Sequence, residues 1–336
     1  GDRGGGAGSL ESGVTDSLVG EELGWRGDRV AESISEGEGM HEVPFLLQAV
    51  SPLHAGTGQS ADIIDLPIAR MRATGIPFVP GASLKGVLRD ACRTRTGKML
   101  SKDDLHAVFG PPSDDASKHA GAITVGDARL LLLPVRSFHG TFAYVTSPLL
   151  LELARRDLNG APAVPAVKGP LATVAKLEEC VLVHGGGRTV FLQDVDLPAR
   201  ADPSVAAWAG FLAPHVAIDP SRPESFTRRF AVVDDETMTF LWETGTQLDT
   251  RVRIDDDSRT VVKGALWIEE SLPPETVLVG KMVAERSRST QSPLDAAAVA
   301  DAVLPGGSAV VVQVGGKATV GRGVCRIVPL KKGGHA

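Results

Sequence analysis

Residues 53–89 read LHAGTGQSADIIDLPIARMRATGIPFVPGASLKGVLR, and this stretch decides the fold that the rest of the chain is expected to adopt. It combines a histidine, a Gly-x-Gly turn, a loop that ends at Asp65, extended segments punctuated by proline and the start of a basic helix. Residues 42–50, which precede it, predict a strand. Residues 76–79 predict an extended segment, because a residue before proline disfavours helical geometry. The first unit of the fold is therefore a strand, a long loop, a short strand and a helix.

A helix is predicted to begin after Pro80, with Ser83 as its N-cap. The apolar positions of this helix share one face, namely Leu84, Val87, Leu88 and Ala91. Its basic positions recur every four residues on another face, namely Lys85, Arg89 and Arg93. A basic stripe of this kind is equally typical of a solvated helix face. The adjoining helix N-terminus adds backbone N–H groups and a positive dipole end, so stripe and terminus together could bind a phosphate.

Composition bounds the class of protein. The chain has 336 residues, of which 43% are hydrophobic and 23% charged, enough for one large domain or two small ones with a buried core. The longest apolar run, residues 130–135, is too short to span a bilayer. Cys92, Cys180 and Cys325 lie far apart, so neither a disulfide framework nor a zinc site is indicated. We expect a soluble, cytoplasmic protein with no membrane partner.

The net charge of −6 is concentrated at one end of the chain. Residues 1–39 hold nine acidic and three basic residues, so residues 40–336 are neutral overall. The Gly-, Ser- and Glu-rich composition of residues 1–39 predicts a disordered acidic extension, to which we assign no function. A neutral body can still carry a basic groove that binds nucleic acid.

The rest of the chain predicts alternating strands and helices. A helix should begin near Ser101, whose spacing to Asp104 resembles a capping box, and an insertion is expected at about residues 159–223. That insertion should hold a hairpin around residues 185–187 and a helix near 205–212. Asp255, Asp256 and Asp257 are expected in a hairpin turn rather than in a metal site. The remaining predictions are strands at 122–133, 141–145, 250–254, 261–268, 309–314 and 323–330 and a helix at 147–156. This order predicts an α+β fold in which helices cover one side of a sheet.

Two familiar nucleotide-binding motifs are excluded. Residues 315–323 lack the Gly-Lys-Ser/Thr ending of a P-loop, and the Gly56-Thr57-Gly58 turn lacks the third glycine of a dinucleotide-binding fingerprint. Two glycine-rich loops with polar or basic residues remain. Glycine lets backbone N–H groups approach a phosphate closely, although most glycine-rich turns are only turns.

Five blocks along the chain stand in a specific order. The first is residues 53–89, with LHAGTG, IDLPI and TGIPFVPGASLKGVLR, and the last is GGKATVGRG at 315–323. Between them lie GTFAYVTSPLLLE (140–152), TRVRID (250–255) and GALWIEESLPPET (264–276). Together they resemble the repeated backbone subunit of type III-B (Cmr) CRISPR effector complexes, a member of the RAMP superfamily, over roughly residues 40–336. The related type III-A subunit shares the first block but matches the later ones less well.

This resemblance implies a fold and a set of partners. The fold would be a single RAMP domain at residues 40–336, with an RRM-like (ferredoxin-like) palm, inserted helical or lid segments and a thumb-like β-hairpin. Copies would stack along a guide (CRISPR) RNA, together with other subunits of the type III effector complex, in antiviral defence. Each thumb would disturb the duplex between guide and complementary single-stranded target RNA at regular intervals. Two alternatives stay open: a catalytically idle guide-binding scaffold, and a stand-alone RAMP endonuclease that processes the guide precursor.

The resemblance also implies site residues for a metal-dependent endoribonuclease. Asp65 would be the central residue, either as a ligand of Mg²⁺ or Mn²⁺ or as the base that accepts the proton of the target 2′-OH. His54 and Glu269 would be secondary catalytic candidates, whereas Asp62 lies outside the motif. Ser271 stands where the family often has an aromatic residue. The guide would contact the first helix and the C-terminal loop through phosphate-binding residues, expected at Ser83, Lys85, Arg89, Gly315, Gly316, Lys317, Gly321 and Arg322.

Overall fold

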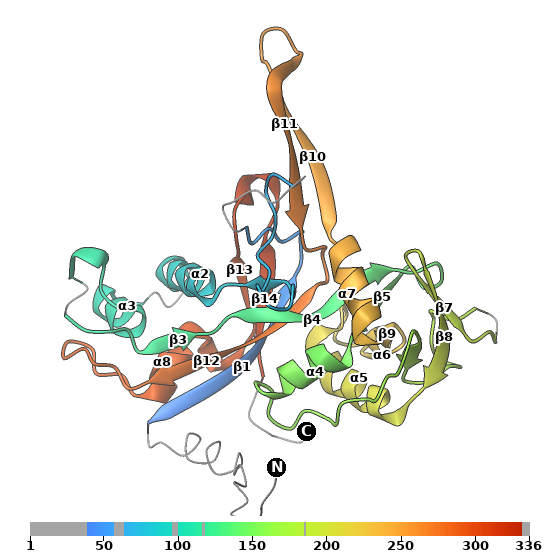
Figure 1. Ribbon diagram of the computed structural model, residues 1–336. Coiled ribbons are helices and arrows are strands. Elements are labelled where there is room, and N and C mark those ends of the chain that lie inside the picture. The colour runs from blue at the N-terminus through green and yellow to red at the C-terminus, as the bar shows by residue number, and fades with distance from the viewer. Residues whose placement is uncertain (1–38, 57–63, 96–99, 116–117, 185, 331–336) are drawn as a thin grey trace, which may run out of the picture. The chain divides into compact units, whose positions relative to one another are not determined.

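A computed structural model describes residues 39–56, 64–95, 100–115, 118–184 and 186–330 of the chain. The described residues form one compact unit, to which every element named below belongs. The predicted acidic extension, residues 1–39, lies outside the described residues except for Gly39. The observed class is α+β, as predicted, with helices packed on a large mixed β-sheet (Figure 1).

The first half of the sheet is antiparallel, with its strands joined in the order β13-β14-β1-β12-β4. β1 pairs with β12 along its whole length, from Met40 opposite Glu285 to Gln48 opposite Val277. Two short strands are attached at the side, β2 to β4 and β3 to β12. The bounds are β1 (Met40–Ala49), β2 (Phe78–Val79), β3 (Ile123–Val125), β4 (Ala128–Arg136), β12 (Val277–Glu285), β13 (Val310–Gln313) and β14 (Val324–Pro329).

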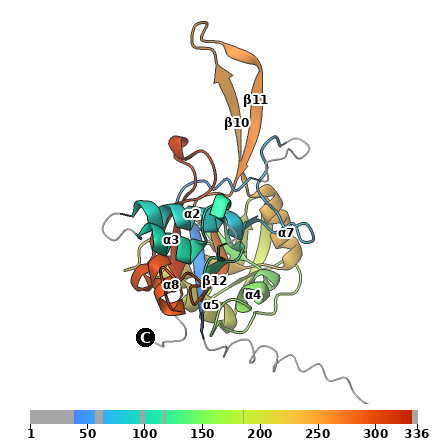
Figure 2. The same cartoon turned by 90° about the vertical axis from the view of Figure 1, so that its left-hand side faces the viewer.

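Helices α2 (Gly81–Thr94), α3 (Lys102–Phe109) and α8 (Ala296–Val303) cover one face of this half (Figure 2). Successive side chains of a strand point to opposite faces, and Phe45 and Leu47 of β1 point towards these helices. They share a buried apolar cluster with Leu88 of α2 and Val299 of α8. α3 has the predicted start, since the Ser101 hydroxyl accepts a hydrogen bond from the Asp104 N–H at 3.0 Å.

The opposite face of the sheet is also covered, so the prediction of helices on one side only is wrong. Leu46 of β1 lies in a second buried cluster with Tyr144 of β5 and with Trp208 and Leu212 of α5. The helices of this part are α4 (Pro148–Arg155), α5 (Pro203–Val216) and α6 (Glu224–Thr227). The main element of this layer is α5, which confirms the predicted helix near residues 205–212. Its apolar residues are not confined to one face, so the sequence pattern did not show that it would cover the sheet.

The sheet continues beyond β4 through β5-β9-β6-β8-β7, in which parallel and antiparallel pairs alternate. Helix α7 (Asp235–Thr244) packs on this half through Met238, Leu241 and Trp242. The strands here are β5 (Phe142–Thr146), β6 (Ala172–Val174), β7 (Thr189–Leu192), β8 (Val195–Ala201) and β9 (Phe230–Val232).

A separate two-stranded hairpin of β10 (Gln247–Ile254) and β11 (Val261–Ser271) projects away from the sheet (Figure 1). Its outer part carries exposed apolar side chains, namely Val252, Ile254, Val261 and Leu266, and Leu248 near its base is exposed as well. At its tip the Asp255 carboxylate accepts hydrogen bonds from the N–H groups of Asp257 and Ser258, so the acidic run forms the predicted turn. Among the described residues no cluster of three or more His, Cys, Asp or Glu side chains is arranged for a metal.

Some predicted boundaries are wrong for identifiable reasons. Helix α2 begins at Gly81 with Pro80 as its N-cap, and Ser83 lies inside the first turn. The Gly81 N–H donates to the Asp127 carboxylate at 2.8 Å, so a residue distant in sequence replaces the local cap. The predicted strand at 122–133 is two strands, β3 and β4. The predicted hairpin around residues 185–187 is reduced to one bridge, between Val183 and Val190, and Gly185 itself is not described.

None of the helices in the described part of the chain is long and apolar enough to cross a membrane.

The start of α2 gives a direct test of the packing. A Cβ atom at Gly81 would lie 2.2 Å from the carbonyl oxygen of Val125. This oxygen belongs to the backbone, which cannot easily move away. We expect Gly81→Ala to lower the free energy of unfolding by about 1–3 kcal/mol, the usual cost of overpacking. Gly86→Ala on the same helix meets nothing within 4 Å and should be stabilising. Urea unfolding of both variants measures the difference, and equal stabilities would contradict the packing.

Candidate nucleic-acid interface and active site

The inner end of strand β11 connects the two loops of the 53–89 signature. On one side Leu53 and Leu272 exchange backbone hydrogen bonds, both 2.9 Å long. On the other side Leu66 donates to the Ile268 carbonyl at 3.1 Å and accepts from the Glu270 N–H at 3.0 Å. Both loops are therefore held at fixed positions along the base of the hairpin.

Asp65 lies at the exposed end of one loop. One of its carboxylate oxygens, Oδ2, accepts a hydrogen bond from the Ile268 N–H at 2.8 Å. This bond fixes the orientation of the side chain. No described residue forms a hydrogen bond with the second oxygen, Oδ1, which is able to contact a ligand.

His54 lies half-buried in the other loop. Its Nδ1 is 2.7 Å from the carbonyl oxygen of Glu270, which can only accept, so Nδ1 carries a proton. Nε2 therefore has a lone pair in the neutral ring and an N–H in the protonated ring. Gly56 leaves room for this nitrogen, since a Cβ atom there would lie 2.6 Å from Nε2.

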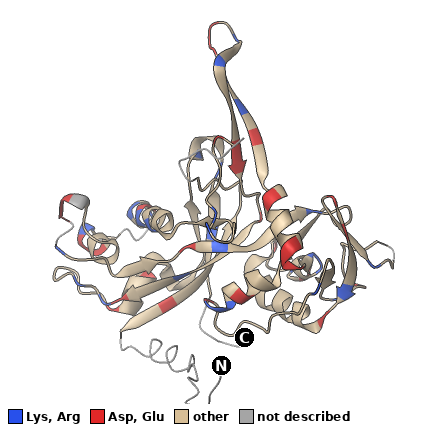
Figure 3. Cartoon of the chain, in the orientation of Figure 1, with Lys and Arg blue, Asp and Glu red and all other residues tan. Residues whose placement is uncertain are grey.

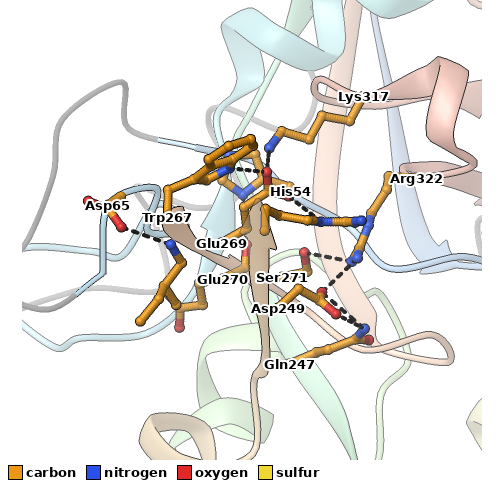
Figure 4. Close-up of polar contacts among 12 residues, drawn as sticks. His54, Asp65, Gln247, Asp249, Trp267, Glu269, Glu270, Ser271, Lys317 and Arg322 are labelled. Carbon is orange, nitrogen blue, oxygen red and sulfur yellow. Dashed lines mark hydrogen bonds and ion pairs between the residues drawn. The ribbon is translucent and has the colours of Figure 1, made fainter. Parts of the chain in front are cut away.

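The C-terminal glycine-rich loop, residues 315–323, packs directly on the His54 turn. Gly315 has a φ of +77°, and a Cβ atom there would lie 2.2 Å from the His54 carbonyl oxygen, so only glycine fits. Lys317 also has a left-handed φ, +69°, and precedes a short 3₁₀ turn, η3 (Ala318–Val320). This geometry brings Lys317 over the base of the hairpin (Figure 4).

Three segments that are distant in sequence meet at one cleft of about 350 Å³. They are the His54 turn with the start of the Leu66 segment, the first turn of α2, and the glycine-rich loop. The predicted residues at its wall are His54, Ser83, Gly315, Gly316 and Lys317. The structure thus unites two motifs that the sequence could only order along the chain.

Lys317 is paired with Glu269 of β11 (Figure 4). The same carboxylate accepts from Trp267 Nε1 at 2.6 Å and lies 3.5 Å from the Arg251 guanidinium. Burial alone would raise the pKa of Glu269, but the hydrogen bonds from Lys317 and Trp267 and the two nearby cations hold it below its ordinary value. Glu269 is therefore an ionised, fully engaged carboxylate, an environment that favours positioning over proton transfer.

Arg322, the second cation of the glycine-rich loop, is buried. Its guanidinium donates to the Asp249 carboxylate at 2.6 Å and to the Ser271 hydroxyl at 3.2 Å. Gln247 donates to the same carboxylate at 3.1 Å. Arg322 was predicted to bind a guide phosphate, and with only 6% of its surface exposed this side chain is directed into the hairpin base.

Glu270 points away from Glu269, as neighbouring residues of a strand must. It pairs with Arg70 at 2.6 Å and accepts from the Ile68 N–H at 3.0 Å. The two adjacent acids of β11 thus hold different loops, Glu269 the glycine-rich loop and Glu270 the segment after Asp65. Sequence reasoning missed the roles of Asp249, Arg251, Trp267, Glu270 and Arg70, although two consecutive buried acids in an otherwise apolar strand end are a recognisable signal.

Helix α2, whose first turn lines the cleft, carries several basic residues (Figure 3). Lys85 and Arg89 are half-buried, and burial together with the nearby Arg89 charge lowers the pKa of Lys85. Arg93 is paired with Asp90 at 2.5 Å. Gly321 is exposed on the glycine-rich loop. Lys85, Arg89 and Gly321 are outside the cleft wall itself.

The described residues fit a metal only in a limited way. Asp65 offers one available carboxylate oxygen, whereas Asp249, Glu269 and Glu270 are engaged with arginine or lysine. This suits a hydrated Mg²⁺ held by one carboxylate, with water and RNA phosphates as its other ligands, rather than an all-protein cage. Asp62, the alternative carboxylate, lies outside the described residues.

The ionised state of Glu269 gives a pH-dependent stability. A carboxylate whose pKa is lowered in the folded state stabilises the fold at pH values above its ordinary pKa of 4.5. This contribution is lost as the pH falls through the lower pKa of the folded state. We expect Glu269→Gln to lower the free energy of unfolding by about 2 kcal/mol at pH 7. Below pH 4.5 the stability of this variant should fall less steeply with pH than that of wild type. Urea unfolding between pH 7 and pH 3 measures both effects. Asp257→Asn at the hairpin tip is the control, and a variant that kept the wild-type pH dependence would contradict this assignment.

Comparison with known proteins assigns the chain to a family. Residues 46–326 match the RAMP superfamily. The CRISPR system Cmr endoribonuclease Cmr4 of Pyrococcus furiosus is 32% identical over 285 residues, which are 84% of this chain and 93% of that protein. The CRISPR system CMR subunit Cmr4 of Saccharolobus solfataricus is 23% identical and covers 84% of this chain and 95% of its own length.

Solved structures agree with this assignment. The crystal structure of oligomeric Cmr4 from Pyrococcus furiosus has a TM-score of 0.64 at 26% identity and covers 86% of this chain and 97% of its own. A chain of the type III-B Cmr-beta complex bound to cognate target RNA has a TM-score of 0.66 with the same coverage, and at 22% identity this likeness concerns the fold alone. The chain belongs to the RAMP superfamily and, within it, to the Cmr4 family.

Proposed function

We propose that this chain is the repeated backbone subunit of a type III-B CRISPR effector complex and an endoribonuclease that cuts target RNA. Copies would bind guide RNA along its length, beside other subunits of the complex, in the cytoplasm. The observation that carries the proposal is the cleft that joins the His54 turn, the start of α2 and the glycine-rich loop, with Asp65 in the adjoining loop. The related protein of Pyrococcus furiosus, which is named an endoribonuclease, supports the activity.

The guide is proposed to run past the cleft. Ser83 and the first-turn N–H groups of α2 would bind a phosphate from one side, and Gly315, Gly316 and Lys317 from the other. Lys85, Arg89 and Gly321 would contact neighbouring phosphates. Such contacts carry no sequence information, which suits a protein that must accept any guide, because base pairing selects the target.

The proposed chemistry uses a nucleophile that RNA supplies itself. The target 2′-oxygen attacks the adjacent phosphorus, the bond to the 5′-oxygen breaks, and a 2′,3′-cyclic phosphate and a 5′-hydroxyl result. Asp65 fits two roles, acceptor of the 2′-OH proton or holder of a divalent metal. His54, when protonated at Nε2, would give a proton to the departing 5′-oxygen.

A divalent ion, Mg²⁺ or Mn²⁺, would be held by Asp65 together with RNA phosphates and water, and would neutralise charge on the phosphate oxygens. Glu269 stays a predicted catalytic residue. Its bonds to Lys317, Trp267 and Arg251 favour a role in positioning.

The antiparallel order β14-β1-β12-β4, with α2 and α8 on one face, supports an RRM-like (ferredoxin-like) palm. Residues 159–223 would be its insertion within one domain that spans 40–336. The hairpin β10–β11 would be the thumb, whose exposed apolar side chains could disturb a guide–target duplex at regular intervals.

The test is target cleavage by the complex reconstituted with guide, complementary RNA and Mg²⁺. We expect regularly spaced cuts by wild type and a loss of about 10²-fold or more in Asp65→Asn, with target binding intact. Asp196→Asn, an exposed acid on β8, is the matched control and should cut normally.

Three other outcomes would contradict parts of the proposal. Equal cutting by wild type and Asp65→Asn would move the chemistry to another carboxylate. Tight binding without cutting by either protein would leave a scaffold. Cutting of guide-precursor hairpins by the chain alone would indicate a processing enzyme.

A further inference from the structure

Two acidic residues face each other across the base of the hairpin β10–β11. Asp249 and Glu269 are directly opposite in the strand register, so their side chains lie on the same face. Like charges at opposed positions repel, and burial strengthens the repulsion because water is largely excluded. The hairpin base therefore needs cations from elsewhere in the chain.

The glycine-rich loop supplies these cations. Arg322 binds Asp249 and Lys317 binds Glu269 (Figure 4). Arg251 of the hairpin adds a third positive charge at 3.5 Å from Glu269. The Arg322 guanidinium also reaches Ser271, which follows on the same face of β11. Two cations that are five residues apart in the loop are thus fixed to two neighbouring positions of the hairpin.

The pairs differ in how they could respond to RNA. Arg322 has 8% of its side chain exposed and Lys317 has 27%. Lys317 also lines the cleft proposed for the guide, so a phosphate can reach it there. Arg322 is directed inward, and its guanidinium is held at two points, by one hydrogen bond to Asp249 and one to Ser271.

We propose that Asp249 and Arg322 are positioning residues for RNA cleavage, whose partly buried ion pair holds the glycine-rich loop in a fixed orientation relative to the hairpin. The loop would hold the guide, and the hairpin base carries Asp65 through the Ile268 N–H. The pair consequently sets the position of the guide relative to the carboxylate that acts on the target, a consequence that rests on the function proposed above.

Loss of the Asp249–Arg322 pair should lower the rate of target cleavage more than the affinity for guide RNA. The phosphate contacts of the guide remain when the pair is broken, whereas displacement of the target from in-line geometry by about 1 Å lowers the rate about 10²-fold. A merely structural pair would instead change thermal stability, with no specific effect on the turnover of a folded complex.

The test compares Asp249→Asn with the apolar double variant Asp249→Leu/Arg322→Met. Replacement of a buried ion pair by packed apolar groups commonly keeps or raises stability, so the double variant separates folding from positioning. Asp157→Asn is the matched control, because it breaks the similarly buried Arg129–Asp157 pair between β4 and the end of α4. Two quantities are measured: amide hydrogen exchange of residues 315–323 in the isolated full chain, and kcat and KM in the reconstituted complex.

We expect both Asp249 variants to exchange faster across residues 315–323 and to lose about 10²-fold in kcat, with KM and guide affinity unchanged. The double variant should keep the wild-type Tm, and Asp157→Asn should change only Tm. Unchanged exchange in the Asp249 variants, or recovery of wild-type kcat in the double variant, would overturn the proposal. If the wild-type complex itself does not cut, the proposed function fails. The exchange data still decide whether the Asp249–Arg322 pair holds the glycine-rich loop.

Discussion

The arrangement of the site depends on the inner end of strand β11. Its backbone is hydrogen-bonded to both loops of the 53–89 signature, and its two consecutive acids point in opposite directions. Glu269 is neutralised by the glycine-rich loop and Glu270 by Arg70 after the Asp65 loop. A buried carboxylate without a partner would be strongly destabilising, so these charges require the loops to close on the strand. One short strand segment thereby fixes three separate parts of the chain.

This arrangement is compatible with both the absence of net charge on residues 40–336 and the proposed binding of RNA. Several cations near the cleft are already compensated by acids, as Lys317 is by Glu269 and Arg322 by Asp249. The groups available to a phosphate in the cleft are therefore backbone N–H groups of the glycine-rich loop and of the start of α2, with a limited number of charged side chains. As proposed, such a surface would bind a nucleic-acid backbone without reading bases, and its affinity would depend on geometry as much as on net charge.

Much of this could be predicted from the sequence where the signal is local. The strand β1, the cap of α3 by Ser101 and the turn at Asp255 follow from patterning and turn chemistry, and the structure confirms them. The start of α2 could not be predicted, because its first N–H is bound by Asp127, 46 residues away. Arg322 was predicted only as a phosphate-binding residue of the glycine-rich loop. Its partner Asp249 is brought close only by the fold, so the pair leaves no pattern along the chain.

The hairpin base is proposed to hold the cleft beside His54 and the Asp65 loop in a fixed relative position. A structure of the assembled complex, with guide and a complementary target that carries 2′-deoxy nucleotides at the cleavage positions, would test this arrangement. We expect a guide phosphate between Ser83 and Lys317, and a displaced target nucleotide whose 2′ position faces the Asp65 carboxylate. A guide bound on another face of the subunit, or target nucleotides that never approach Asp65, would contradict it.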